Sequence, residues 1–215
     1  STGGRPFDKN KPLIVFVHGS GLSHITWVLQ TRYFAFHGYS VLAIDLPGHG
    51  RSTRSTTNLP EITDLISEVT KSRGPYHGIV CHSFGGVAAL NAVRSGATFE
   101  KLVLISPAFY EVKPTFKTFV SLFGLDEEYY ADRFFDLAES LYGASPGEFG
   151  LDRFSNQIET ETLIVHCVDD KEAKKEIAVT LHSDMKNSVL HLTEGLGHRR
   201  ILRDEKVAEL VMNFL

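Results

Sequence analysis

The sequence predicts an α/β protein in which helices cover a doubly wound, mainly parallel sheet of six strands. Two observations predict this class. Six apolar segments of strand length recur along the chain, rich in Val, Ile and Leu and without polar alternation, as in strands buried on both faces. Segments with helical spacing of apolar residues lie between them. The 215 residues fit one domain, expected over 1–215.

Each predicted strand ends near glycine, proline, aspartate or serine, which favour turns. The six predicted strands are 13–19, 40–48, 77–83, 101–107, 162–170 and 188–195. Helical spacing is clearest in three segments, 60–71, 84–94 and 205–215. The segment 84–94 is dense in small residues, which permit close contact between a helix and a sheet.

The segment 108–154 is much longer than the helix that usually connects two parallel strands, and it holds about half of the chain's aromatic residues. Two interpretations are open. The aromatic side chains pack the insertion's own helices against each other, or the insertion is a helical cap whose inner face lines an apolar pocket.

Composition excludes several classes of partner. The formal net charge is -4, whereas nucleic acids and anionic membranes bind basic surfaces. The sequence has no apolar run approaching the roughly 18 residues of a membrane span, and no basic start followed by an apolar run. We therefore expect a cytoplasmic protein that binds no nucleic acid and has no membrane span.

Ser83, in the stretch IVCHSFGG, lies between a predicted strand and a predicted helix. A serine at such a tight turn projects its Oγ above the sheet, as in the pattern G-x-S-x-G. Small residues are needed two positions either side of the serine, and here they are Cys81, in place of the usual glycine, and Gly85. A serine hydroxyl becomes a nucleophile only beside a base, which itself needs an orienting group.

Candidates for both groups follow later strands. Asp169 and Asp170 close the fifth predicted strand, and His198 follows the sixth. Parallel strands bring their carboxyl ends to one edge of the sheet, which is where ligands bind in open α/β sheets. The order Ser, Asp, His therefore predicts a catalytic triad of Ser83, Asp170 and His198.

The segment HGSG (18–21) follows the first predicted strand. Its glycines allow backbone N–H groups to face a cavity, and the N–H groups of Ser20 and Phe84 would then converge on a substrate oxyanion. An ordinary glycine-rich turn is the alternative interpretation.

Five motifs together resemble the α/β-hydrolase family, in its esterase/lipase-like branch, from about residue 12 to the end. They are HGSGLSHITW (18–27), DLPGHGRS (45–52), HSFGG (82–86), VHCVDD (165–170) and GLGH (195–198). The resemblance implies that Ser83 is the nucleophile, His198 the general base, and Ser20 and Phe84 the oxyanion donors. It assigns the acid to Asp170 rather than Asp169, because Cys167 occupies the position of the family's glycine. His49 is implied to be structural.

The chain also departs from the family, whose members open with two antiparallel strands. Residues 1–12 are loop-like instead, so the resemblance implies six parallel strands in the order 40–48, 13–19, 77–83, 101–107, 162–170 and 188–195. The strand 40–46 is then a sheet edge, next to the strand 13–19. An apolar edge favours pairing with another chain, which suggests a homo-oligomer unless residues 1–12 cover it. The first 55 residues or so resemble one sub-branch and the rest another, which raises the hypothesis of an engineered or recombined chain.

The same strand order separates Cys81 and Cys167 by one strand. Their Cα atoms would then lie about 9–10 Å apart, beyond the roughly 7 Å limit for a disulfide, so we expect two free, buried cysteines.

The sequence thus predicts a serine esterase that cleaves small-molecule carboxylic esters with apolar groups. It contains no HExxH, CxxC or GxGxxG motif, and no metal or organic cofactor is expected. Two alternatives stay open. The same triad serves thioesters, lactones and carbon–carbon bonds, and a hydrolase-like chain can be a non-catalytic binding or structural protein.

Overall fold

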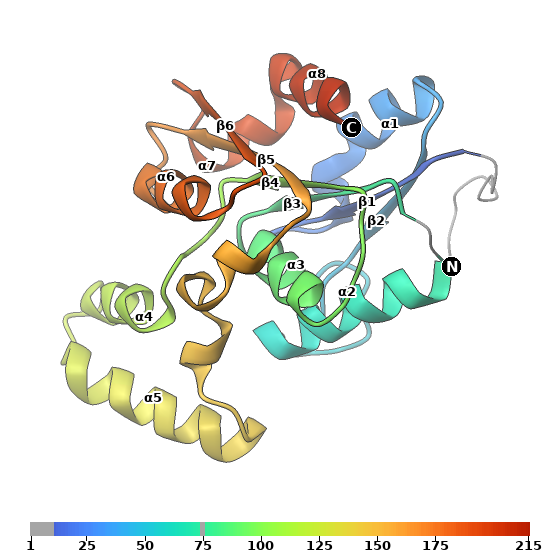
Figure 1. The fold of residues 1–215 in the computed structure, drawn as a ribbon. Coiled ribbons are helices and arrows are strands. Elements are labelled where there is room, and N and C mark those ends of the chain that lie inside the picture. Colours follow the sequence, from blue (N-terminus) through green and yellow to red (C-terminus); the bar gives the residue numbers. More distant parts are fainter. Residues whose placement is uncertain (1–10, 74–75) are drawn as a thin grey trace.

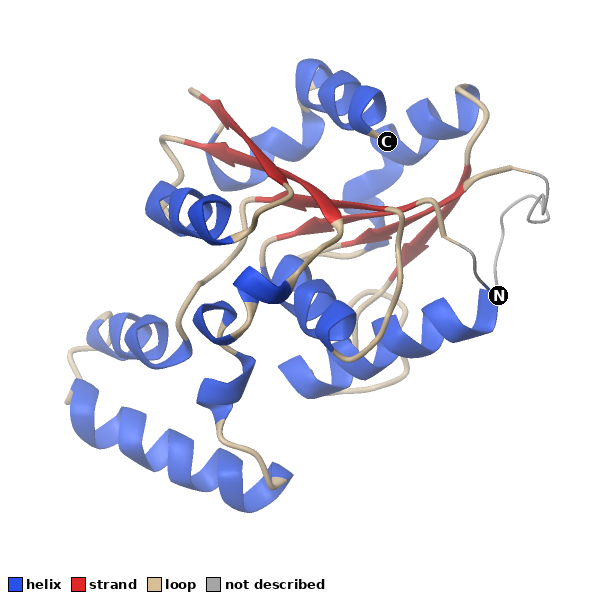
Figure 2. Cartoon of the chain, viewed as in Figure 1, coloured by secondary structure: helices blue, strands red, loops and turns tan. Residues whose placement is uncertain are grey.

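A computed structural model describes residues 11–73 and 76–215 and shows a six-stranded parallel sheet with helices on both faces (Figures 1 and 2). The strands are β1 (Leu13–Val17), β2 (Ser40–Ile44), β3 (Gly78–His82), β4 (Lys101–Ile105), β5 (Glu161–Cys167) and β6 (Ser188–Thr193). Their order is β2-β1-β3-β4-β5-β6, and all neighbours are parallel. The predicted fold class and strand order are confirmed.

The predicted strands were too long at their carboxyl ends, because the turn residues there lie beyond the last sheet hydrogen bonds. The first predicted strand, for example, included His18 and Gly19, whereas β1 ends at Val17. Those extra residues form the loops above the carboxyl edge, where the candidate site residues lie.

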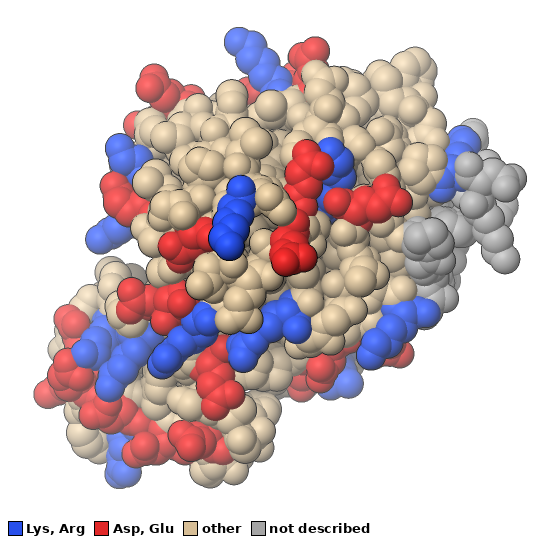
Figure 3. Space-filling view, in the orientation of Figure 1, with Lys and Arg blue, Asp and Glu red and all other residues tan. Residues whose placement is uncertain are grey.

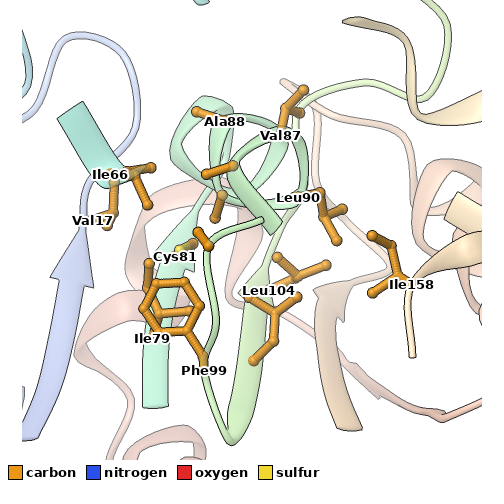
Figure 4. Packing of buried hydrophobic residues seen from close by; sticks show 14 of the residues in the cluster. Val17, Ile66, Ile79, Cys81, Val87, Ala88, Leu90, Phe99, Leu104 and Ile158 are labelled. Carbon is orange, nitrogen blue, oxygen red and sulfur yellow. The ribbon is translucent and has the colours of Figure 1, made fainter. Parts of the chain in front are cut away.

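Alternation along each strand divides the core into two apolar layers. One layer packs against α2 (Leu59–Arg73), α3 (Phe84–Arg94) and α6 (Lys175–Asp184). Figure 4 shows part of this layer, with Cys81 and Leu104 from the sheet below Val87 of α3. The other layer packs against α1 (Val28–Phe36) and α8 (Glu205–Phe214). Burial on both faces explains why the strand sequences are continuously apolar.

Cys81 lies in β3 and Cys167 at the end of β5, with β4 between them. Both are buried and free, as expected. Burial raises the pKa of the Cys81 thiol well above its ordinary value, so this side chain behaves as a small apolar residue.

Between β4 and β5 the chain leaves the sheet, and we call residues 108–154 the cap segment. It contains α4 (Val112–Ser121), α5 (Glu127–Tyr142) and two short turns of helix, η2 (Pro146–Phe149) and η3 (Leu151–Arg153). In Figure 1, α4 and α5 project away from the sheet as a separate lobe. The lobe is closed at its base, where the Leu151 N–H donates to the Tyr110 carbonyl at 2.7 Å.

Aromatic and charged contacts hold the two helices of the cap segment, α4 and α5, together. The ring of Phe116 in α4 stacks on that of Phe134 in α5, with centroids 4.1 Å apart. Lys113 pairs with Asp132 at 2.6 Å. On the face shown in Figure 3, side chains of both charge signs gather over this lobe and no large area of one sign is seen.

The edge of the sheet at β2 is formed by residues 40–44, and among the described residues only β1 pairs with it. Its side chains from Val41 to Ile44 are half-buried. Residues 1–10, which were expected to be loop-like or to cover this edge, lie outside the described residues. Within the described part of the chain, no helix is long and apolar enough to cross a membrane.

Candidate active site

The turn between β3 and α3 places Ser83 in an unusual backbone conformation, with φ 52° and ψ -122°. A positive φ at a non-glycine residue costs about 1–3 kcal/mol and is concentrated at functional sites. The turn is fixed on both sides, because the Ser83 N–H donates to the Ile105 carbonyl at 3.0 Å and the Gly86 N–H donates to the Ser83 carbonyl at 2.9 Å.

The turn leaves no room for larger neighbours. A methyl group at Gly85 would lie 2.6 Å from the His18 carbonyl oxygen, and one at Gly19 would lie 2.8 Å from the Ser83 Cβ. Cys81 is accommodated because its side chain points down into the core, where Gly86 leaves space above it: a methyl group there would be 3.9 Å from the Cys81 Cβ. The cysteine therefore does not obstruct the turn.

His198 lies between Ser83 and Asp170. Its Nε2 is 3.0 Å from the Ser83 Oγ, and its Nδ1 is 2.7 Å from the Asp170 Oδ2. A carboxylate only accepts hydrogen bonds, so Nδ1 carries the ring proton and Nε2 is free to accept from the serine hydroxyl. The structure thus brings the three sequence-predicted residues into one hydrogen-bonded chain, in which each is 9% exposed.

Asp170 is held as an anion. Its Oδ1 accepts from the N–H groups of Glu172 and Ala173, each at 2.9 Å. Burial alone would raise the pKa of this carboxyl, but the hydrogen bonds from His198, Ala173 and Glu172 hold it below its ordinary value. The charge is therefore present at neutral pH, and it faces the histidine.

Asp169 points elsewhere, although it is adjacent in the chain. Its Oδ2 accepts from the Gly195 N–H at 2.6 Å, in the turn before His198. Adjacent residues leaving a strand project in different directions, so only one of the two carboxylates reaches the imidazole. In the structure that carboxylate belongs to Asp170.

Two further buried histidines, His82 and His166, lie beside the hydrogen-bonded residues of the site. Neither was identified as a site residue from the sequence. His82 donates from Nε2 to the His198 carbonyl at 2.9 Å. Burial, followed by the neighbouring His198, lowers the pKa of His82 to about 3, so the ring is neutral. His166 donates from Nε2 to the Ala173 carbonyl at 3.0 Å, and this nitrogen lies 3.6 Å from the Asp170 Oδ2. The residue types alone carried no signal for these contacts.

The loop HGSG is held in place by the loop after β2. His18 donates from Nδ1 to the Gly19 carbonyl at 2.8 Å, and its Nε2 accepts from the Leu46 N–H at 3.1 Å. The Gly21 N–H donates to His49 Nε2 at 3.0 Å. His49 therefore contacts the HGSG loop and not the hydrogen-bonded chain around Ser83.

Asp45 also links the segment that follows HGSG to the loop after β2. Its carboxylate accepts from the backbone N–H groups of His24 and Arg51, at 2.7 and 2.9 Å. Burial opposes ionisation, but these hydrogen bonds lower the pKa of Asp45 below its ordinary value. The motif DLPGHGRS thus positions the first loop of the site.

The two predicted oxyanion donors come from the HGSG loop and the start of α3, which both adjoin Ser83. Phe84 is the first residue of α3, and the opening N–H groups of a helix have no acceptor within it. Ser20 follows Gly19, whose Cα approaches the Ser83 side chain as described above. Both backbone amides thus belong to segments packed directly around the serine.

The structure also contains an apolar pocket of about 630 Å³. Phe84, the neighbour of Ser83, and Phe109 line it at the sheet end. The walls of the pocket come from the cap segment, from the loop before α2 and from the start of α2 itself. They include Phe116, Phe119, Phe134, Leu137, Ala138 and Leu141 of the cap segment and Leu59 of α2. Asn58 of that loop donates to the Tyr142 hydroxyl at 3.3 Å, which joins the two walls.

Over 11–73 and 76–215, no group of three or more His, Cys, Asp or Glu side chains is arranged to hold a metal ion.

Comparison with known proteins identifies similar chains. A model of the alpha/beta hydrolase family matches residues 14–210. A non-heme chloroperoxidase from Streptomyces lividans is 37% identical over 100 residues, which are 43% of this chain and 36% of the relative. A bifunctional esterase/perhydrolase from Acinetobacter calcoaceticus is 35% identical over 103 residues, 46% of this chain and 37% of the relative. The chain spans about a third of the length of the curated relatives it matches.

Solved structures match over more of the chain. An esterase from Exiguobacterium antarcticum has a TM-score of 0.71 at 19% identity, covering 94% of this chain and 91% of that one. A monoacylglycerol lipase from Paleococcus ferrophilus has a TM-score of 0.67 at 20% identity, covering 94% and 93%. At these identities the likeness concerns the fold.

Proposed function

The chain belongs to the alpha/beta hydrolase family, and we propose that it is a serine hydrolase that cleaves carboxylic esters through an acyl-enzyme. The observation that carries the proposal is the hydrogen-bonded chain from Ser83 through His198 to Asp170, with contacts of 3.0 and 2.7 Å. These are the distances at which a base takes a proton from a nucleophile and an acid orients that base.

In the proposed reaction, the Ser83 Oγ attacks the ester carbonyl carbon while His198 Nε2 takes the hydroxyl proton. Asp170 holds the ring by Nδ1 and stabilises the imidazolium that forms. The N–H groups of Ser20 and Phe84 donate to the oxyanion of the tetrahedral intermediate. When the intermediate collapses, His198 gives the proton to the leaving alcohol and an acyl-Ser83 ester remains.

Water completes the cycle. His198 Nε2 removes a proton from a water molecule, whose oxygen attacks the acyl carbon. When the second tetrahedral intermediate collapses, its bond to the Ser83 Oγ breaks, His198 gives its proton back to that oxygen, and the carboxylic acid is released. The protein groups that take part in these steps are Ser83, His198, Asp170 and the backbone donors of Ser20 and Phe84.

The pocket beside Phe84 supports an apolar acyl or alcohol portion in the substrate. Its lining is almost entirely aliphatic and aromatic. Burying each additional methylene contributes about 0.8 kcal/mol, which a pocket can use for specificity until it is full.

Two alternatives share this site. Thioester, lactone or carbon–carbon bond hydrolysis would use the same residues. A non-catalytic binding or structural protein would have the same fold but would not catalyse a reaction. The names of a partly matching relative, an esterase/perhydrolase, and of the esterase with a similar fold favour esters.

Replacing the proposed nucleophile tests the assignment. Ser83→Ala is expected to lower kcat for p-nitrophenyl ester hydrolysis on the order of 10³-fold or more, because the acyl-enzyme cannot form. The control is Ser95→Ala, an exposed serine at the other end of α3, which should keep the wild-type rate. If Ser83→Ala keeps most of the activity, Ser83 is not the nucleophile and the proposal fails.

The two adjacent carboxylates give a matched pair. Asp170→Asn should lower kcat by about 10³–10⁴-fold, since the amide cannot hold the imidazole in the same tautomer or stabilise its charge. Asp169→Asn keeps an oxygen acceptor for the Gly195 N–H and should cost far less. Steady-state kinetics of both variants on one ester decide the matter, and equal losses would contradict the role proposed for Asp170.

The pocket predicts a dependence on acyl length. With p-nitrophenyl esters of increasing chain length, kcat/KM should rise from acetate until the pocket is full. Ala138→Phe narrows the pocket and should bring that maximum to a shorter ester, whereas Ser140→Phe, at an exposed position of α5 outside the lining, should not. A flat or falling trend from acetate onward in the wild type would count against the cap segment as a binding wall.

The edge strand β2 supports a further proposal, that copies of the chain pair through residues 40–46. An apolar strand at the edge of a sheet favours such pairing. Sedimentation at micromolar concentration should give a dimer or a higher oligomer. A stable species with the mass of one chain, 23.9 kDa, would overturn this proposal and leave the catalytic one intact.

A further inference from the structure

His82 precedes Ser83 in the chain, and its side chain is 1% exposed. We propose that His82 is a positioning residue, which sets the place of His198 by holding the backbone carbonyl of that residue. The inference rests on the proposed roles of Ser83 and His198. It concerns a residue that touches neither the substrate nor the reacting atoms.

The first observation is a closed ring of contacts. His82 Nε2 donates to the His198 carbonyl at 2.9 Å, and His198 Nε2 lies 3.0 Å from the Ser83 Oγ. Because His82 and Ser83 are consecutive, the ring runs from the nucleophile to its neighbour, across to the backbone of the base, and back through the imidazole. The strained turn fixes one side of this ring, and the His82 hydrogen bond connects the backbone of His198 to that side.

The second observation is that His82 can take only one useful orientation. Its Nδ1 has no hydrogen-bond partner within the described residues and faces the Cα of Gly19, where a methyl group would lie 2.9 Å away. Turning the ring over about the Cβ–Cγ bond would move Nε2 away from the His198 carbonyl, which would lose this donor. The ring also packs on that of His198, with centroids 4.7 Å apart.

The charge state of His82 agrees with this role. A carbonyl oxygen only accepts, so Nε2 carries the proton, and burial keeps the ring neutral at physiological pH. A neutral ring is required here, because His198 becomes positively charged when it takes the serine proton and a second cation beside it would oppose that transfer.

The third observation concerns the turn before His198. Its amides are held by other groups: the Gly195 N–H donates to Asp169 at 2.6 Å, and the Gly197 N–H donates to the Cys167 Sγ at 3.0 Å. These contacts fix the turn that precedes His198. The carbonyl of His198 itself is held by His82, the last residue of β3. Without that donor, the His198 carbonyl loses its hydrogen bond to β3, and we expect the base to shift relative to the nucleophile.

The test compares two side chains of similar length at position 82. His82→Gln keeps an N–H donor near the position of Nε2, and His82→Met does not. We expect His82→Met to lower kcat at least about tenfold relative to His82→Gln, with KM for a p-nitrophenyl ester within about twofold. The rate of labelling by a fluorophosphonate should fall in parallel, because labelling needs the same proton transfer. His191→Gln, at an exposed position of β6, is the control.

Stability is measured alongside, by thermal unfolding, so that loss of the fold is not read as loss of positioning. If His82→Met does not fold, His82→Asn replaces it, because its shorter side chain carries a donor that cannot reach the carbonyl. Equal kcat in the donor and non-donor variants, or a loss expressed in KM alone, would overturn the inference. Either result with Ser83→Ala inactive leaves the proposed function standing, whereas an active Ser83→Ala removes both.

Discussion

The strained turn at Ser83 is the constraint on which the rest of this site depends. Its positive φ is unfavourable for a serine and persists only because the surrounding structure determines it. Sheet hydrogen bonding from the Ser83 N–H, the start of α3, and the close approach of Gly19 and Gly85 all oppose relaxation. The cost of about 1–3 kcal/mol is offset by a core in which β3 and α3 are almost entirely buried.

The parallel sheet delivers the other groups to this fixed point. β1, β3, β5 and β6 all end at the same edge, so the HGSG loop, the serine, the aspartate and the histidine meet there although they are far apart in the sequence. Hydrogen bonds then refine each placement: Asp45 and His49 hold the first loop, and Asp169 and Cys167 hold the turn before His198. The cap segment adds an apolar wall to the pocket that Phe84, the residue after the serine, also lines.

Much of this arrangement could be predicted from the sequence, because strand patterns and motif order determine which residues share a sheet edge. Asp170 could be preferred to Asp169 only through the family resemblance, whereas the structure separates them by their hydrogen-bond partners.

The helix α1 was not identified, since VLQTRYFAF mixes apolar and polar residues without a clear stripe, and it buries Gln30 with Phe34. The contact between His82 and His198 spans 116 positions, and no local pattern encodes it. The two interpretations of the aromatic cap proved compatible: Phe116 and Phe134 stack on each other and also line the pocket.

The central claim is that Ser83 is an activated nucleophile. Reaction of the folded protein with a fluorophosphonate, followed by mass spectrometry of the intact chain and of its peptides, tests that claim most directly. The account predicts one adduct per chain, located on Ser83. An unlabelled Ser83 in the folded protein, or an adduct on another residue with Ser83 free, would contradict it.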